Sequence, residues 1–300
     1  MNHTSSGTLA ATAPFDFELS LRFIGGFRPV AGEQRAAERT LTKALFANGQ
    51  PIVAQLADAG DEATPRLAYT LHADRPIDPA TQRAAEDRLS FFLSLNNDLR
   101  PFYALAEADP IFAPIARQLY GYHQVKFLTP FENAAWAVLT QRNSIAAARG
   151  LKQRLTERYG ASPTLAGQRY PIFPEAAALA QADPAELFDL LPAMRRAEYL
   201  QAAAQAFARA DEGWLRTAPY DEAERWLRGI NGIGAWSASF ILLRGLGRTE
   251  RLPAGESKLA AAVEKHYAGG RRLSPAAAAG LGARYGAYQG YWAHYMRVAG

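Results

Sequence analysis

The stretch GINGIGAWSASFILL, residues 229–243, joins two helical patterns through a short turn that contains two glycines. Residues 222–228 and 235–243 are the predicted helices, and Gly232 and Gly234 bracket Ile233, an apolar side chain suited to plug the helix junction. Glycine tolerates positive φ and lets the backbone approach a partner closely. The first N–H groups of the second helix then point outward without a partner, which makes them a site for an anion such as a phosphate.

A bare Gly-x-Gly is more often only a tight turn between helices. The wider pattern is more specific, because an apolar residue precedes the glycines and Ala-Trp-Ser-Ala follows them. This pattern predicts a helix-hairpin-helix, a module that holds a phosphate backbone without reading the base sequence.

The composition excludes several classes of functional site. The chain has 300 residues, enough for two domains, and a net charge of +4, which permits an anionic partner without requiring one. It has no cysteine, which excludes disulfides, thiolate zinc sites and iron–sulfur clusters, and its five histidines show no metal-ligand spacing, so no metal site is predicted. No apolar run approaches the roughly 18 residues of a membrane helix, and the first residues do not resemble a signal peptide. We therefore expect a cytoplasmic protein.

The first hundred residues favour a small α+β domain on an antiparallel sheet. Period-two alternation predicts strands at residues 15–24, 52–60 and 66–73, whereas the alanine- and charge-rich residues 35–46 favour a helix. Residues 1–13 are expected to be a flexible tail, residues 14–100 the sheet domain, and residues 101–300 an all-α region. Breaks are predicted near residues 142–144 and near Leu191, where a proline follows. Five residues directly precede a proline and are predicted to start helices: Asp109, Thr129, Ser162, Asp183 and Ser274.

With the hairpin and these patterns in place, GINGIGAWSASFILLRGLGRTERLPAGESKL at residues 229–259 resembles the hairpin and catalytic segment of the helix-hairpin-helix DNA glycosylase superfamily. The resemblance is strongest to the 3-methyladenine DNA glycosylase II (AlkA-like) branch. It extends to residues 120–148, 195–200 and 286–299, and to the N-terminal region from residue 14. It implies a mainly α fold, with helix-hairpin-helix domains preceded by the α+β domain.

The same resemblance implies a monofunctional glycosylase that hydrolyses the N-glycosidic bond of alkylated purines such as 3-methyladenine and leaves an abasic site. The expected partner is damaged double-stranded DNA, bound by a monomer at the hairpin of Gly232, Ile233 and Gly234. No cofactor is implied apart from a cation that hairpin carbonyls hold in the family. Lyase relatives carry a Schiff-base lysine where this chain has Trp236, so strand cleavage is not expected.

Glu256 matches the catalytic aspartate of the family, whose pattern resembles LPAGD where this chain has LPAGE at residues 252–256. A carboxylate beneath the sugar stabilises the positive charge that develops as the bond breaks, and it orients or deprotonates water. Glutamate supplies this group on a stem one methylene longer. Three alternatives stay open: a working substitute, a slowed catalyst, or a helix-dipole partner in a DNA-binding protein without turnover.

Further site residues follow from the resemblance. Alkylated purines are electron-poor and stack on aromatic faces, although aromatic residues at helical spacing are usually core residues. A base-flipping enzyme also fills the gap in the duplex with a wedge, which falls on residues 141–143, where a surface arginine at a helix break is the alternative. A deaminated or oxidised base is an alternative substrate. The predicted set is Trp236, Phe240, Tyr291 and Trp292 for the base pocket, Arg142 and Gln141 for the wedge, and Arg244, Arg248 and Lys258 for the DNA backbone.

Overall fold

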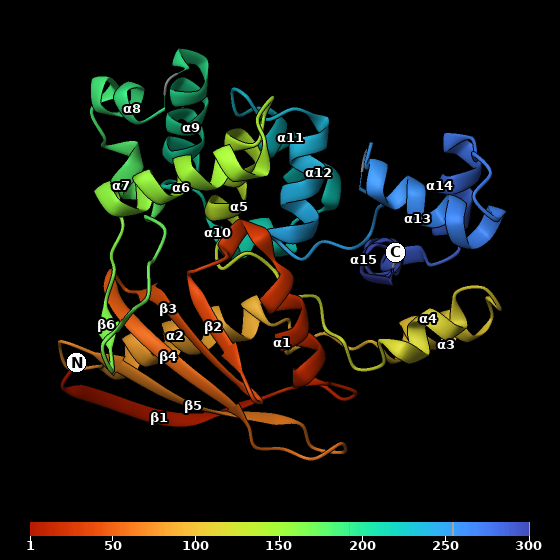
Figure 1. Ribbon diagram of the computed structural model, residues 1–300, viewed down its shortest axis with the longest axis horizontal. Helices are drawn as coiled ribbons and strands as arrows, with labels where there is room; N and C mark the ends of the chain where they lie inside the picture. The colour runs from red at the N-terminus through yellow and green to blue at the C-terminus, as the bar shows by residue number, and fades with distance from the viewer. Residues whose placement is uncertain (192, 254, 300) are drawn as a thin grey trace.

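The computed structural model describes residues 1–191, 193–253 and 255–299. One five-stranded sheet lies at one side of the molecule, and most of the helices stack above and beside it (Figure 1). Among the described residues, no helix has both the length and the apolar character needed to cross a membrane.

The sheet is antiparallel throughout, in the order β1-β5-β4-β3-β2. Asn48 and Gly49 join β3 to β4 with φ of 48° and 69°, and this pair of residues favours a tight hairpin because both tolerate positive φ. The strands are β1 (His3–Ala10), β2 (Gln34–Ala37), β3 (Thr40–Ala47), β4 (Gln50–Asp58) and β5 (Arg66–Ala73).

The structure overturns the prediction of a flexible tail at residues 1–13. Strand β1 pairs with β5 along its whole length, from His3 opposite Ala73 to Ala10 opposite Arg66. Its residues are mostly polar or small, and most of them are exposed, so the segment lacks the apolar alternation that identifies a strand. The partner strand supplies the order that the local sequence does not indicate.

Two secondary-structure predictions are wrong: a predicted strand is a helix, and a predicted helix is a pair of strands. Residues 15–24, predicted as a strand, contain most of helix α1 (Phe17–Gly26), whose buried face is formed by Phe17, Leu21 and Ile24 at helical spacing. The Asp16 side chain caps this helix by accepting a hydrogen bond from the Leu19 N–H at 3.1 Å. Residues 35–46, predicted as a helix, form the hairpin of β2 and β3, because pairing with β4 outweighs the local helix propensity.

The helical region agrees with the predicted breaks at residues 142–144 and near Leu191. Of the five predicted helix starts, Thr129, Asp183 and Ser274 are N-caps, whereas Asp109 lies in a turn and Ser162 precedes a short strand. The helices are α2 (Pro79–Phe92), α3 (Arg100–Glu107), α4 (Ala113–Gln118), α5 (Pro130–Leu139), α6 (Ile145–Tyr159), α7 (Ala176–Ala180), α8 (Pro184–Leu190), α9 (Met194–Phe207), α10 (Glu212–Thr217), α11 (Tyr220–Arg228), α12 (Ala235–Arg244), α13 (Ser257–Ala268), α14 (Pro275–Ala283) and α15 (Gln289–Ala299). Short elements are η1 (Arg28–Val30), η2 (Gly286–Tyr288), β6 (Thr164–Leu165) and β7 (Gln168–Arg169).

Two large hydrophobic cores organise most of these elements, and a small third cluster joins Ala44 and Val53 of the sheet to Tyr170 and Ile172. The first joins the sheet, α1 and α2 to α3, α4, α13 and α15, so the C-terminal helices share a core with the N-terminal domain. The second lies among α5 to α12 and contains the buried side chains of the hairpin. The hairpin and the C-terminal helices therefore belong to different packing units, and a site between them depends on how the two units meet.

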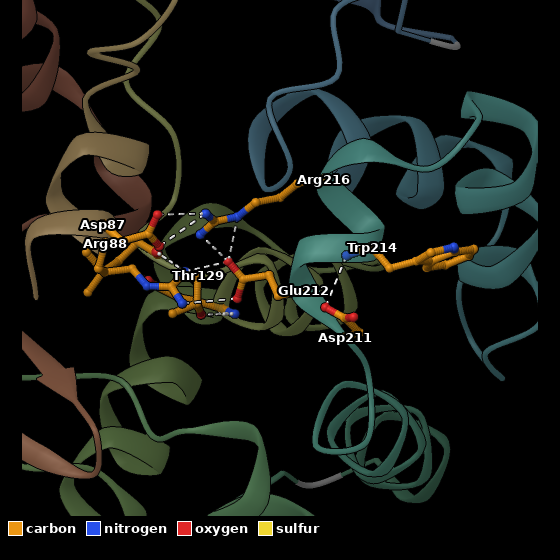
Figure 2. A network of polar contacts seen from close by, with 9 residues as sticks. Asp87, Arg88, Thr129, Asp211, Glu212, Trp214 and Arg216 are labelled. Carbon is orange, nitrogen blue, oxygen red and sulfur yellow. Dashed lines mark hydrogen bonds and ion pairs between the residues drawn. The ribbon is translucent and has the colours of Figure 1, made fainter. Parts of the chain in front are cut away.

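Ion pairs fix α2 to α10, as Figure 2 shows. Arg88 on α2 donates from Nη1 and Nη2 to the two carboxylate oxygens of Glu212 on α10, at 2.8 and 3.1 Å. Arg216 also pairs with Glu212 at 2.5 Å and reaches Asp87 at 3.1 Å. The bidentate arrangement specifies orientation as well as contact, so it holds the two packing units in one relative position.

A second ionic cluster is buried deeper, at Lys152 on α6. Its Nζ lies 2.5 Å from the carboxylate of Glu33 and 2.6 Å from that of Glu132, and it donates to the Pro29 carbonyl at 3.2 Å. All three charged side chains are largely removed from solvent. Such a cluster specifies geometry, because each charge left alone in the interior would be costly.

Candidate active site

The hairpin between α11 and α12 has the predicted plug. Ile233 is buried, with 4% of its surface exposed, and packs in the core of the helical unit. Of the two hairpin glycines, only Gly232 has a backbone conformation that requires glycine. Its φ is +88°, and a Cβ at this position would lie 2.3 Å from the Tyr199 ring. Gly234 has φ of −85° and is the N-cap of α12, where it offers no side-chain cap. The first N–H groups of α12 are therefore left without a side-chain cap.

The predicted wedge loop, residues 140–144 between α5 and α6, is tied to this hairpin. The Gln141 side chain donates from Nε2 to the Gly232 carbonyl at 2.8 Å. Arg142 next to it is exposed and has φ of +50°, a conformation that is uncommon for arginine and that often marks a functional loop. The structure thus brings the wedge and the hairpin together, with Gln141 as the link and Arg142 at the tip.

Glu256 is the N-cap residue of α13, yet its side chain makes no capping hydrogen bond. The carboxylate instead lies 2.7 Å from Nε of Arg297 on α15, with the Glu256 side chain 17% and the Arg297 side chain 28% exposed. Burial raises the pKa of Glu256, while Arg297, Arg244 and Lys258 act in the opposite direction. A carboxylate in this setting is partly desolvated, paired with one cation and still within reach of solvent.

A row of aromatic side chains runs from the hairpin to α1. Trp236 is 43% exposed and stacks on Phe240, with ring centres 5.2 Å apart and planes 14° apart. Phe240 meets Phe127 edge to face at 6.0 Å, Phe127 meets Phe27 at 5.2 Å, and Phe27 lies 5.2 Å from Phe23. We call these five residues the aromatic row. Phe23 and Phe27 were missed from the sequence, and the signal was their i, i+4 spacing after the Asp16 cap.

Arg244 is not a DNA-backbone contact, because only 2% of it is exposed. Its guanidinium lies 5.0 Å from the ring centres of both Phe23 and Phe27, and its Nη1 donates to Nδ1 of His294 at 3.0 Å. Burial lowers the pKa of Arg244 to about 10. Burial also lowers the pKa of His294, as do the nearby charges of Arg244 and Arg297, so His294 stays neutral. Arg244 therefore fixes α12 against α1 and α15.

Three more predicted contacts, one to a phosphate and two to the base, are also wrong. Arg248 is buried and pairs with Glu250 at 2.6 Å, so it is not available to a phosphate, whereas Lys258 is exposed. Tyr291 and Trp292 belong to the core rather than to a base pocket: Asn97 donates to the Tyr291 hydroxyl at 2.6 Å, and Trp292 donates to the Tyr267 hydroxyl at 3.3 Å. Aromatic residues at helical spacing on α15 fill the core, and the face with His294 and Arg297 reaches Arg244 and Glu256.

Among the described residues, no cluster of three or more His, Cys, Asp or Glu side chains is arranged to hold a metal. Two hairpin carbonyls are already in use, since Ile230 accepts from the Ile233 N–H at 3.0 Å and Gly232 accepts from Gln141. Chemically, the arrangement offers a partly enclosed carboxylate, stacking surfaces and a helix N-terminus with unpaired N–H groups. These are the elements needed to stabilise a cationic transition state beside an anionic polymer.

Comparisons with known proteins find similar sequences and structures. Residues 135–279 match the family model of the HhH-GPD superfamily base excision DNA repair protein. The chain is 31% identical over 180 residues to a DNA-3-methyladenine glycosylase of Bacillus subtilis (strain 168), covering 59% of each chain. It is 38% identical over 118 residues to DNA-3-methyladenine glycosylase 2 of Escherichia coli (strain K12), covering 38% of this chain and 40% of the relative.

The chain thus spans about 59% and 40% of the lengths of these two relatives. Among solved structures, a 3-methyladenine DNA glycosylase from Archaeoglobus fulgidus superposes with a TM-score of 0.80 at 20% identity, covering 97% of both chains. This likeness confirms the predicted fold, in which a small antiparallel sheet domain precedes the helical helix-hairpin-helix region.

Proposed function

We propose that this chain, whose residues 135–279 match the family model of the HhH-GPD superfamily base excision DNA repair protein, is a monofunctional DNA glycosylase for alkylated purines such as 3-methyladenine. The observation that carries the proposal is Glu256, a partly buried carboxylate beside Arg297, where the family has its catalytic aspartate. The partner is damaged double-stranded DNA in the cytoplasm, and the protein acts as a monomer without a cofactor.

The hairpin and the wedge loop bind the DNA. The uncapped N–H groups at the start of α12 bind one phosphate, and Lys258 adds a positive charge on the first turn of α13. Arg142, held at the tip of its loop, enters the duplex and occupies the space of the extruded nucleotide. The extruded base then stacks on the exposed face of Trp236, which Phe240 supports from behind.

Glu256 is the catalytic residue for bond cleavage. As the bond between C1′ and the base nitrogen breaks, the electron pair leaves with the base and positive charge develops on the sugar. The Glu256 carboxylate stabilises this charge and accepts a proton from the water that adds to C1′. Arg297 favours the ionised carboxylate and fixes its position. Since Trp236 replaces the lyase lysine, no Schiff base forms, and an abasic site remains.

Single-turnover release of 3-methyladenine or 7-methylguanine from duplex DNA tests the proposal. We expect release by the wild-type protein, at least a ~10²-fold loss in Glu256→Gln, and wild-type rates in the control Glu250→Gln, whose carboxylate pairs with Arg248 instead. Equal rates in the wild type and Glu256→Gln would refute the assignment of the catalytic residue.

The longer stem of glutamate and its ion pair with Arg297 favour a second candidate, a lesion-binding protein without turnover. Glu256→Asp separates the two candidates. If the wild type binds damaged DNA without releasing a base and Glu256→Asp releases it, the second candidate is correct.

A further inference from the structure

The segment from α13 to the C-cap of α14, residues 257–284, is strongly basic. It holds five lysines and arginines and one carboxylate, so its net charge of +4 equals that of the entire chain. The carboxylate, Glu264, accepts the Leu273 N–H at 3.1 Å and serves the loop after α13. None of the five cations takes part in an ion pair within the described part of the chain. The cations, all exposed, are Lys258, Lys265, Arg271, Arg272 and Arg284.

The two lysines share one face of α13. Lys258 and Lys265 are seven residues apart, which is almost two helical turns, so their side chains lie in line along the helix. The buried residues Leu259, Ala262 and Val263 lie on a different face and pack in the core shared with α15 and the sheet domain. The lysine face of α13 is therefore directed to solvent over the length of the helix.

The end of α13 fixes the first of the arginines that follow it. Gly269 and Gly270 have φ of +59° and +86°, so the chain reverses its direction there. Arg271 then returns to the Ala268 carbonyl with its backbone N–H at 3.1 Å and with its Nε at 3.3 Å. A side chain that is already held loses less rotamer entropy when it binds a ligand. Arg271 thus presents a preorganised guanidinium at the far end of α13.

We propose that Lys265, Arg271 and Arg272, which we call the basic track, bind the phosphate backbone of one arm of the duplex, beyond the extruded nucleotide. The inference rests on the proposed function, because it extends the same DNA interface. Glu256 is the N-cap of α13, so the basic track begins near the catalytic carboxylate and leads away from it. Helices α13 and α14 form one end of the helical region, with α11 and α12 between them and α9 (Figure 1).

The dimensions of α13 match duplex DNA. Its 12 residues give a length of about 18 Å. Phosphates of one strand repeat about every 3.4 Å along the duplex axis, so the far end of α13 reaches a phosphate about five base pairs from the extruded nucleotide. The neighbouring helix α14 carries no charged side chain, so no carboxylate on it repels the backbone. A row of unpaired cations over this distance is suited to a rod with regularly spaced negative charges.

The test measures binding by fluorescence anisotropy to duplexes that carry a stable abasic-site analogue, with each arm about 12 or about 3 base pairs long. Cutting one particular arm is expected to weaken binding of the wild type but not of the triple variant Lys265→Gln, Arg271→Gln, Arg272→Gln. Cutting the other arm, which the hairpin holds, should affect both proteins alike. On the long duplex, the triple variant should lower the slope of log affinity against log salt by about 2.7.

A matched control removes the same charge elsewhere. Arg35→Gln, Arg75→Gln, Arg83→Gln changes three exposed arginines of the sheet domain and is expected to bind as the wild type does. If the triple variant of the basic track unfolds, Lys265→Gln with Arg272→Gln leaves the bonds of Arg271 in place and should lower the slope by about 1.8.

Kinetics separate this proposal from the proposed function. Single-turnover base release at saturating protein is expected to be unchanged in the triple variant, because the basic track does not touch the reacting atoms, while half-saturation requires about 10-fold more protein. Equal salt slopes in the wild type and the triple variant would overturn the proposal, as would a loss of affinity that is independent of which arm is cut. A wild-type protein that releases no base would refute the proposed function instead, and the binding assay would still decide the role of the basic track.

Discussion

The carboxylate of Glu256, at the start of α13, lies 2.7 Å from Nε of Arg297 on the last turn of α15. An acidic residue at a helix start commonly serves the helix itself, by accepting hydrogen bonds from its N–H groups. Here no such bond is made, and the side chain is directed to a neighbouring helix. The position is therefore arranged to hold a charge at a fixed place between two helices.

The pH profile of base release depends on this pair. Burial raises the pKa of Glu256 above the ordinary value of 4.5, so the working carboxylate is lost as pH falls through a range above that value. Arg297→Met removes the cation that lowers the pKa most, so we expect the acidic limb of the rate profile to move to higher pH. Single-turnover rates between pH 4 and 8 measure this, and an unmoved limb would show that the Glu256 carboxylate does not control the rate.

The two hairpin glycines are expected to respond differently to alanine. Gly232→Ala forces a Cβ to 2.3 Å from the Tyr199 ring at φ of +88°, so we expect a loss of about 1–3 kcal/mol of stability and weaker DNA binding. Gly234→Ala places its Cβ in open space at an ordinary φ, so thermal stability should not change. Thermal unfolding and fluorescence anisotropy with duplex DNA give both numbers. A similar fall in stability for the two variants would contradict the assigned geometry.

The salt dependence of DNA binding distinguishes Lys258 from Arg244. If exposed Lys258 contacts a phosphate, Lys258→Ala should reduce the slope of log affinity against log salt by about 0.9. Arg244→Met should leave the slope unchanged and lower thermal stability instead, because the guanidinium is buried against Phe23, Phe27 and His294. A reduced slope in Arg244→Met would mean that this arginine reaches DNA after all.

The buried cluster at Lys152 is expected to control stability without touching catalysis. Lys152→Met leaves the carboxylates of Glu33 and Glu132 buried without their common cation, so we expect a loss of about 3–5 kcal/mol. Chemical denaturation measures this loss, and Lys265→Met on α13 is the control for removing a lysine. Restored stability in the triple variant that also changes Glu33 and Glu132 to Gln would confirm the electrostatic cause.

The sequence predicted the parts of the fold that are determined locally. Ile233 between two glycines, the Thr129, Asp183 and Ser274 caps and the break at residues 142–144 all depend on neighbouring residues, and the structure has each of them. Strand β1 and the β2–β3 hairpin depend instead on partners distant in sequence, and no local pattern indicates them. Helix α1 was mistaken for a strand because its apolar residues satisfy period two and helical spacing at once.

Site residues follow the same division. The hairpin, Gln141 and Trp236 were predicted from contiguous motifs, and the structure places Gln141 against Gly232 and leaves Trp236 exposed. Arg297 and His294 were not predicted, because their approach to Glu256 and Arg244 depends on how α15 packs. The predictions for Arg244 and Arg248 failed for the opposite reason. Both arginines were expected to be exposed because they lie close to the hairpin in sequence, but packing buries both side chains.

The location of Phe23 and Phe27 affects how the base selectivity of such a protein can be changed. Phe23 and Phe27 extend the aromatic row from the N-terminal domain, whereas the hairpin and Glu256 lie on one stretch near the other end of the chain. If a bound base stacks along this row, substitutions at Phe23 or Phe27 reshape its surroundings without altering residues 229–259. Libraries that vary positions 23 and 27 and retain residues 229–259 would explore new base selectivity, whereas exchange of the entire N-terminal domain would also disturb the core that it shares with α13 and α15.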